Sequence, residues 1–589
     1  MEWLNLVKHN FKMVEYKLSS WDLSEIKPSD LNSLFNQIEK KVSLFQEKRK
    51  FLTKTISSGQ FMSLIKELEQ LRIITGKLGT YPQLKFAENS GDQEAAALSS
   101  KVETFLTKMG NRLLFFNLWF KSLPENKAKE LIRASGKYCY FLGNLRRTAP
   151  YTLKENEEKI INIKDLAGVS ALNSVYDILT SQFEYEFAGK KLTQDALLVY
   201  ARNPSSKKRE AAYKVLLARY LQHRDVIGEI YKNIINNWRE ESIGLRGYKS
   251  PLNVRNIANN IPDKAVASLL KVCEKNQPLF HRFFEIKRKK LGLKQMRRFD
   301  LYAPLQKKEE QKLSYDGAVK LVLDTFREFS PEFYQEALNI INKKRVHSCL
   351  QKNKSTGAFC CSVTAQLNPY VLLNYAGTLR DVSTLAHELG HGVHHNLAKQ
   401  QTEFTSQAAL PLAETASIFS EMLLSERLQE KYPSKAKELL YVKLDEIYAS
   451  IIRQAGFVNF EIKAHQMMEE GKTIEEMSKV YLADLRQQLG PKVKVDDIFA
   501  NEWCYIPHIF HTPFYCYAYA FGNLLTLALY EMYKEKGKQF TPKIIALLSK
   551  GGSESPLEIT EAVGADIASE AFWQKGFDVI KGMIDKVEK

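Results

Sequence analysis

One segment, residues 378–421, constrains the fold of this 589-residue chain more than any other. It contains the motif His-Glu-x-x-His at residues 387–391, with the two histidines four positions apart. On an α-helix this spacing places both imidazoles on one face, one turn apart, where they can hold one metal ion. Glu388 projects about 100° further around the helix. It can therefore reach a water on the metal without binding the metal itself.

The flanking sequence predicts the helix that this motif needs. Thr378 and Asp381 have the spacing of a capping box, with Asp in place of the usual Glu. Apolar residues recur at the helical period and define a face separate from the motif histidines. These residues are Val382, Leu385, Ala386, Leu389, Val393 and Leu397. The next two histidines, His394 and His395, are expected at the surface or beside the site.

Glu414 supplies the third ligand that the motif lacks. It is expected on a second helix, where Leu412, Ala416 and Phe419 have helical spacing. Together, His387, His391 and Glu414 make the His₂Glu set that leaves one zinc position open for water. Glu421 lies two turns further along and is suited to bond a ligand histidine.

Two other readings of the motif exist. The histidines could be ordinary surface or core residues of a helix. The overlapping Glu-x-x-His could also belong to a di-iron bundle, but such bundles need a second copy of that motif and the chain has none. Zinc is therefore the predicted metal.

The same residues carry a family resemblance. Residues 377–391, 413–417 with Glu421, and 506–508 with 513–515 resemble the oligoendopeptidase F branch of the thimet-oligopeptidase-like zinc peptidases. The resemblance covers most of the chain and is densest between residues 355 and 525. It implies a mainly α, zincin-type fold with a deep substrate channel between two helical halves. It also implies hydrolysis of internal bonds in short unstructured oligopeptides.

The resemblance further implies a histidine and a tyrosine that stabilise the oxyanion of the reaction. Matching positions favour His508 and Tyr515, with Tyr519 as the main competitor and Tyr517 as a further one. The thimet branch has a glycine-rich loop where this chain has residues 511–514, so roles from that branch do not transfer directly. In this reading Glu388 accepts the proton of the attacking water while zinc lowers that water's pKa.

Strand signal is rare in the chain. The clearest strand is expected at residues 370–375, with residues 357–363 as its partner, both just ahead of the histidine helix. An exposed edge there could hold an extended peptide by strand addition. The alternative is a small hairpin that only packs on the helix.

The composition of the chain predicts its core, its domains and its compartment. A hydrophobic content of 44% supports a large core, and a break at residues 201–206 suggests two domains, 1–195 and 196–589. The N-terminus has no signal peptide pattern, and seven scattered cysteines indicate reduced thiols in a cytoplasm. Residues 503–530 lack charged side chains but contain two prolines and two histidines, which indicates a loop entering a buried helix. No membrane association is expected.

A net charge of +17 raises the possibility of an anionic partner. The densest basic cluster is Lys287–Lys290 with Lys294, Arg297 and Arg298, but no nucleic-acid-binding signature accompanies it. An oligopeptide substrate and no nucleic acid are expected. The alternative within enzymes is a metallocarboxypeptidase or dipeptidyl carboxypeptidase with the same zinc helix. A basic helical nucleic-acid-binding protein is the distant alternative, and it predicts binding that weakens steeply with salt.

Overall fold

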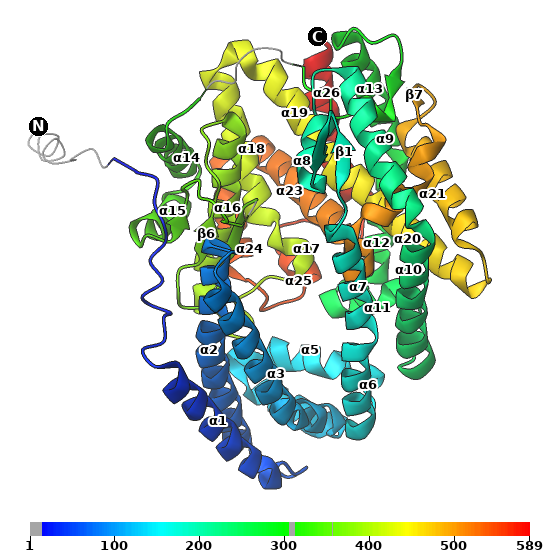
Figure 1. Cartoon of the computed structure of the whole chain (residues 1–589). Coiled ribbons are helices and arrows are strands. Elements are labelled where there is room, and N and C mark those ends of the chain that lie inside the picture. Colours follow the sequence, from blue (N-terminus) through cyan, green and yellow to red (C-terminus); the bar gives the residue numbers. More distant parts are fainter. Residues whose placement is uncertain (1–14, 306–311, 356) are drawn as a thin grey trace, which may run out of the picture.

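The protein is described from a computed structural model, which covers residues 15–305, 312–355 and 357–589. Within these residues the chain forms 26 α-helices and three small β-sheets (Figure 1). The prediction of a mainly α fold with a small sheet is confirmed. Residues 1–8, where the sequence indicates no signal peptide, lie outside the described part of the chain.

Long amphipathic helices open the chain. Helix α1 (Leu31–Glu47) starts after Asp30, whose side chain accepts a backbone hydrogen bond as the predicted N-cap. Helices α2 (Ser58–Glu88) and α3 (Gln93–Ser122) pack along each other in the lower part of Figure 1. The buried apolar residues of α1–α3 form clusters separate from the main core. The first part of the chain therefore buries much of its own apolar surface.

Shorter elements connect these helices to the rest of the chain. They are α4 (Glu125–Ala134), α5 (Cys139–Arg147), α6 (Glu155–Ala167), α7 (Val169–Ser181), β1 (Tyr185–Phe187), β2 (Lys190–Leu192) and α8 (Gln194–Ala201). The main hydrophobic core runs from Tyr176 on α7 to Val587 near the C-terminus. The division into residues 1–195 and 196–589 remains a prediction.

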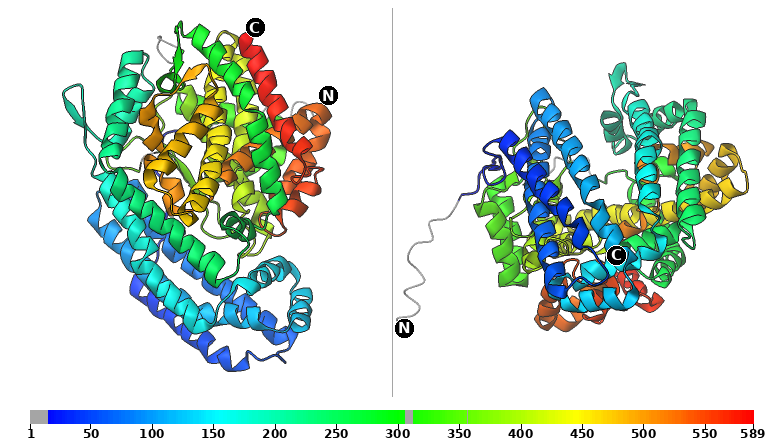
Figure 2. Two further views of the ribbon diagram at one scale, coloured as in Figure 1. Left: turned by 90° about the vertical axis from the view of Figure 1, so that its right-hand side faces the viewer. Right: turned by 90° about the horizontal axis from the view of Figure 1, so that it is seen from below.

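Helices resume after the break at residues 201–206. The first group is α9 (Ser206–Gln222), α10 (Arg224–Arg239), α11 (Pro251–Asn259), α12 (Asp263–Lys275), α13 (Gln277–Lys290), α14 (Tyr315–Phe329) and α15 (Pro331–Asn342). Seen from below, α1–α3 and α8–α10 stand on opposite sides of the molecule (Figure 2). This arrangement agrees with two helical halves, and a substrate channel between them remains a prediction.

The C-terminal half completes the body. Besides the helices around the histidine motif, it contains α19 (Ala436–Ile447), α20 (Arg453–Glu469), α21 (Ile474–Leu489), α24 (Thr541–Ser549), α25 (Pro556–Glu561) and α26 (Glu570–Glu588). A parallel pair of two-residue strands, β3 (Met296–Arg297) and β7 (Val493–Lys494), links the two groups.

Three helices form the centre of the molecule. Helix α16 (Leu379–Leu397) packs against α18 (Thr415–Lys431), and α18 packs against α23 (Tyr517–Lys536). The short α17 (Leu410–Ala413) precedes α18, and the short α22 (Pro507–His511) precedes α23. Helix α23 is buried along most of its length, as the sequence of residues 503–530 predicts. Among the described residues, none of the helices is long and apolar enough to cross a membrane.

A three-stranded sheet lies against α16. Its order is β4 (Val346–His347), β6 (Tyr370–Leu372) and β5 (Phe359–Cys361). Strand β5 pairs with β6 in the antiparallel sense, which confirms the predicted partnership, although both strands are shorter than expected. The parallel strand β4 was not predicted from the sequence, because a strand of two residues shows no recognisable pattern. Strand β5 forms one edge of this sheet.

Candidate functional site

The N-terminus of α16 is fixed by the predicted capping box. The Thr378 hydroxyl accepts a hydrogen bond from the Asp381 backbone N–H at 3.2 Å, and the Asp381 carboxylate accepts one from the Thr378 N–H at 3.0 Å. The predicted apolar face of the helix is buried. His387 and His391 lie on a different side and remain partly exposed. The helix therefore buries one face and presents its two histidines on another.

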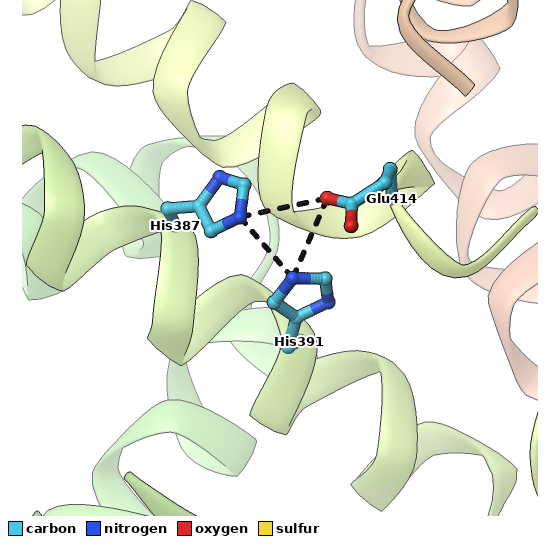
Figure 3. A group of neighbouring side chains, drawn as sticks. All are labelled: His387, His391 and Glu414. Atoms are coloured by element: carbon cyan, nitrogen blue, oxygen red, sulfur yellow. Dashed lines mark hydrogen bonds and ion pairs between the residues drawn. The ribbon is translucent and has the colours of Figure 1, made fainter. Parts of the chain in front are cut away.

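Three side chains converge in front of this helix (Figure 3). His387 Nε2 lies 3.2 Å from His391 Nε2, and Glu414 Oε2 lies 3.5 Å and 3.4 Å from these two nitrogens. Zinc bonds of about 2.0–2.1 Å in a tetrahedron would place ligand atoms about 3.4 Å apart. The donor set and its spacing therefore fit a zinc ion. In the described part of the chain, this is the one group of three or more such side chains with metal-binding spacing.

The carboxylates around the trio also favour a positive charge at this position. His387 Nδ1 lies 2.6 Å from Glu421 Oε1, so a neutral His387 donates there and leaves Nε2 as a lone pair facing the Glu414 carboxylate. Burial opposes a charge on His387, but Glu421, Glu414 and Glu388 together raise its pKa to about 9. Without a metal the site thus takes up a proton. A divalent cation would supply the same positive charge.

Glu414 reaches the site from a junction. It was expected on a helix, but it is the N-cap residue between α17 and α18, with φ −83° and ψ −2°. Its Oε2 accepts a hydrogen bond from the Ser417 hydroxyl at 2.9 Å. Gly390 lets the two helices approach, because a Cβ there would lie 2.7 Å from the Ser417 Cα. Close packing of α16 on α18 therefore sets the distance between Glu414 and the histidines.

Glu421 makes the contact that its spacing predicts. Besides His387, its carboxylate pairs with the Lys443 ammonium on α19. Burial alone would raise the pKa of Glu421, but Lys443 and His387 lower it to about 2. Sequence reasoning missed Lys443, because only the packing of α19 on α18 brings it near. The pair keeps Glu421 ionised and fixes the orientation of the His387 ring.

Glu388 lies beside the trio without joining it. Its residue is 6% exposed, and burial, assisted by Glu414 and Glu421, raises its pKa to about 7. It lines a cavity of about 620 Å³ together with His387 and Glu414. A carboxyl group in this position can take up and release a proton near neutral pH.

The aromatic segment places one tyrosine at this cavity. Tyr519 lines the cavity, and its hydroxyl lies 3.4 Å from His508 Nε2. The ring of Tyr515 stands edge-on to that of Tyr519 at 5.1 Å and parallel to the His508 ring at 6.3 Å. Neither His508 nor Tyr515 lines the cavity. Tyr517 is buried elsewhere and accepts a hydrogen bond from Asn259 at 2.7 Å. Three of the four predicted candidates, His508, Tyr515 and Tyr519, thus form one aromatic cluster, in which Tyr519 is the residue that lines the cavity.

The other two histidines of α16 are not among the three converging donors. His394 and His395 are both buried, which excludes the surface position that was one expectation for them. His395 Nε2 lies 3.0 Å from the Leu367 carbonyl, to which it donates. Burial lowers the pKa of His394 to about 4. These two side chains are neutral parts of the packing.

Among the described residues, β6 is the one strand that pairs with β5, so the other edge of β5 is open, next to α16. Alternate residues of β6 bond to β4, since the Val371 N–H donates to the Arg345 carbonyl at 2.9 Å. The intervening residues of β6 therefore bond to β5, where Tyr370 pairs with Cys361. By alternation, the backbone N–H and C=O of Cys360 point to the open edge of the sheet. An extended chain could add there as a further strand.

Two segments of the chain match known protein families. Residues 199–579 match peptidase family M3, and residues 119–185 match a segment described as Oligopeptidase F. The match to peptidase family M3 contains α16, α18, α23 and the junction residue Glu414, and thus every side chain of the trio.

Full-length relatives and solved structures agree with these matches. An oligoendopeptidase F homolog of Borreliella burgdorferi is 25% identical over 97% of this chain and 98% of its own. Oligopeptidase PepF of Bacillus subtilis is 23% identical over 97% of this chain and 87% of its own. The crystal structure of oligoendopeptidase-F from Enterococcus faecium, 20% identical, covers 95% of this chain and 98% of its own with a TM-score of 0.72. This last similarity is one of fold.

Proposed function

The chain belongs to peptidase family M3 and is a metallopeptidase, and we propose that it is a zinc endopeptidase for short unstructured oligopeptides. The observation that carries this proposal is the trio of His387, His391 and Glu414 at tetrahedral spacing, with the Glu388 carboxyl beside it in one cavity. A metal site that only supported the fold would be closed by four protein ligands, whereas these three donors would leave one position open in the cavity that Glu388 lines.

Each residue of the site then has a chemical task. Zinc held by His387, His391 and Glu414 would supply a water of lowered pKa and polarise the scissile carbonyl group. Glu388 accepts the proton of the attacking water and delivers it to the leaving amine nitrogen. Glu421 holds His387 in the tautomer whose Nε2 is free to bind.

The aromatic cluster serves the oxyanion. Peptide hydrolysis builds negative charge on the carbonyl oxygen, and preorganised donors lower its energy. His508 and Tyr515 are proposed donors by family resemblance. Tyr519 is added because it lines the cavity that Glu388 and Glu414 also line, and its hydroxyl lies 3.4 Å from His508 Nε2.

The edge of β5 is the proposed peptide-binding surface. Ala358, two residues before Cys360, lines the cavity, so the open backbone groups of this strand run toward the trio. A substrate in extended form would pair with these groups and be recognised by its backbone rather than by a particular side chain. Folded proteins lack such a free extended segment.

A reducing compartment suits the chain. All seven cysteines fall within the described residues and none is paired in a disulfide. Free thiols, together with helices unable to span a membrane in the described residues, support a cytoplasmic location as the proposal.

Cleavage of a ten-residue, C-terminally amidated peptide tests the function. Products are followed by mass with the enzyme as purified, after chelation, and after zinc is restored. Internal fragments that disappear with chelator and return with zinc are expected. A metallocarboxypeptidase or dipeptidyl carboxypeptidase would leave the amidated peptide intact but cut its free-acid form. No cleavage of either peptide by the zinc-loaded protein would overturn the proposal.

A further inference from the structure

The turn between α22 and α23 contains a strained residue. Phe514 has φ +58°, in the left-handed region that bulky L-residues disfavour. Such a conformation persists only where the surrounding structure holds it. The residues after this turn include Tyr515 and Tyr519, so its shape bears directly on the aromatic cluster.

Three contacts hold the turn. The Phe514 N–H donates to Glu461 Oε1 on α20 at 2.7 Å. The Arg255 Nε on α11 donates to the Pro513 carbonyl at 3.1 Å. The Phe514 ring is fully buried and packs on the ring of His465, 4.9 Å away and one turn beyond Glu461 on α20. The turn is thus fixed from two different helices.

Glu461 is an unusual side chain for such a place. Its residue is 1% exposed, and in the described part of the chain its second oxygen, Oε2, has no hydrogen-bond partner. Burial raises its pKa to about 8, although the Phe514 N–H and Arg255 oppose this. A buried carboxyl without an ion pair is costly, and an apolar side chain would fill the core at lower cost. The hydrogen bond that it accepts from the Phe514 N–H explains why a carboxyl group occupies this position.

Movement of the turn would be transmitted to the site. Tyr515 follows Phe514 directly, and its ring contacts both Tyr519 and His508. The Tyr519 hydroxyl lies 3.4 Å from His508 Nε2 at the cavity. A misplacement of about 1 Å in an active site can cost about 10²-fold in rate, because oxyanion donors act through their preorganised position.

We propose that Glu461 is a positioning residue for the reaction. By accepting the Phe514 N–H, it fixes the turn and thereby the placement of His508, Tyr515 and Tyr519 relative to the metal-binding trio. This inference rests on the proposed function, since it assumes that the aromatic cluster acts on the oxyanion. Glu461 itself does not touch the cavity.

Two substitutions separate the hydrogen bond from the packing. In Glu461→Gln the side-chain carbonyl can still accept the Phe514 N–H, whereas Glu461→Leu fills a similar volume without an acceptor. We expect kcat of the Gln variant to stay within about threefold of wild type, and kcat of the Leu variant to fall at least about tenfold. KM and zinc content should change by less than about twofold in both.

Inhibitor binding gives a readout that does not need turnover. A phosphinic peptide mimics the tetrahedral oxyanion, whereas a cleaved product peptide does not. The Leu variant should bind the phosphinic peptide at least about tenfold more weakly and the product with unchanged affinity. Equal losses for both ligands, or wild-type kcat in the Leu variant, would overturn the inference. Wild-type protein without chelator-sensitive turnover would contradict the proposed function instead.

Discussion

Two carboxyl groups beside His387, those of Glu388 and Glu421, have very different pKa values. Burial raises the pKa of Glu388 to about 7, and its neighbours Glu414 and Glu421 add to the rise. Burial acts on Glu421 as well, but Lys443 and His387 bring its pKa to about 2. A group that exchanges protons needs a pKa near the working pH, and a group that orients a ligand needs a permanent charge. The neighbours therefore assign proton exchange to Glu388 and orientation to Glu421.

Replacement of Glu388 tests the first assignment. Glu388→Gln should lower kcat by about 10²–10⁴-fold, because the amide cannot accept the proton of the attacking water. The zinc content should be unchanged, since Glu388 is not one of the three converging donors. Glu446→Gln is the matched control, because Glu446 lines the same cavity without contacting His387. Metal analysis and peptide cleavage measure both effects. Full activity of Glu388→Gln would exclude the proposed proton transfer.

The tyrosines can be ranked by removal of one hydroxyl at a time. Tyr519→Phe should lower kcat by about 10²-fold with little change in KM, since the lost hydroxyl is a donor at the cavity. Tyr515→Phe tests the donor that the family resemblance favours. Tyr517→Phe is the control, because its hydroxyl bonds to Asn259 away from the site. A large loss for Tyr515→Phe with none for Tyr519→Phe would reverse the ranking.

The metal trio depends on how closely two helices pack. Gly390 of α16 faces the backbone of α18, where an added Cβ would lie 2.7 Å from the Ser417 Cα and 2.8 Å from the Ala416 carbonyl oxygen. Backbone atoms cannot rotate aside as a side chain can. A larger residue at Gly390 must therefore push the helices apart. Because Glu414 starts α18 and both histidines are on α16, any separation changes the trio.

Gly390→Ala should consequently weaken zinc binding and the fold together. Overpacking of this kind costs about 1–3 kcal/mol, which should appear as a lower Tm and a raised Kd for zinc. Gly143→Ala on α5 is the control, because no atom lies within 4 Å of its added Cβ. It should leave zinc binding unchanged and stabilise its helix by up to about 1 kcal/mol. Wild-type zinc affinity in Gly390→Ala would show that the helix spacing does not set the site.

Local patterns explain which elements the sequence could predict. The capping box of α16 and the spacing of its two histidines depend on neighbours a few residues away, so both are visible in the sequence. The position of Glu414 at a helix junction and the pairing of Glu421 with Lys443 depend on packing between helices. The ranking of the tyrosines depends on a turn with Phe514 in a conformation usually adopted by glycine or asparagine. No pattern in the sequence predicts that turn.

The basic character of the whole molecule has a structural explanation in its densest cluster. Lys287 is fully buried and pairs with Asp445 at 2.5 Å, and Arg298 is buried in a pair with Glu502. Arg297 pairs with Asp300 at 2.8 Å. These three basic side chains are therefore held in ion pairs within the protein. The absence of a nucleic-acid partner remains a prediction.

The free energy of unfolding should depend on pH in a way that Glu461 determines. Its folded-state pKa of about 8 exceeds the ordinary value of 4.5, so the folded protein keeps a proton that the unfolded chain releases. The contribution to stability is fully present below about pH 4.5 and is lost as pH rises through 8. The limiting slope is about 1.4 kcal/mol per pH unit. Glu461 interacts electrostatically with Arg255, Tyr231 and Cys516, and none of these three has an ordinary pKa inside the window from 4.5 to 8. The ordinary pKa of the nearby His465 does lie inside this window, and burial lowers it to about 3 in the folded protein.

Comparison with Glu461→Gln isolates this contribution, because the amide does not titrate while every other group remains. The Tm of both proteins is measured from pH 4.5 to 9, where other groups shift the two curves alike. The wild-type curve should fall relative to that of the Gln variant as pH rises, so that the difference grows up to about pH 8 and then levels off. Parallel curves would mean that Glu461 is ionised in the folded protein throughout. In that case the Phe514 N–H would be donating to a charged acceptor, and Glu461→Gln should then weaken the turn and lower kcat.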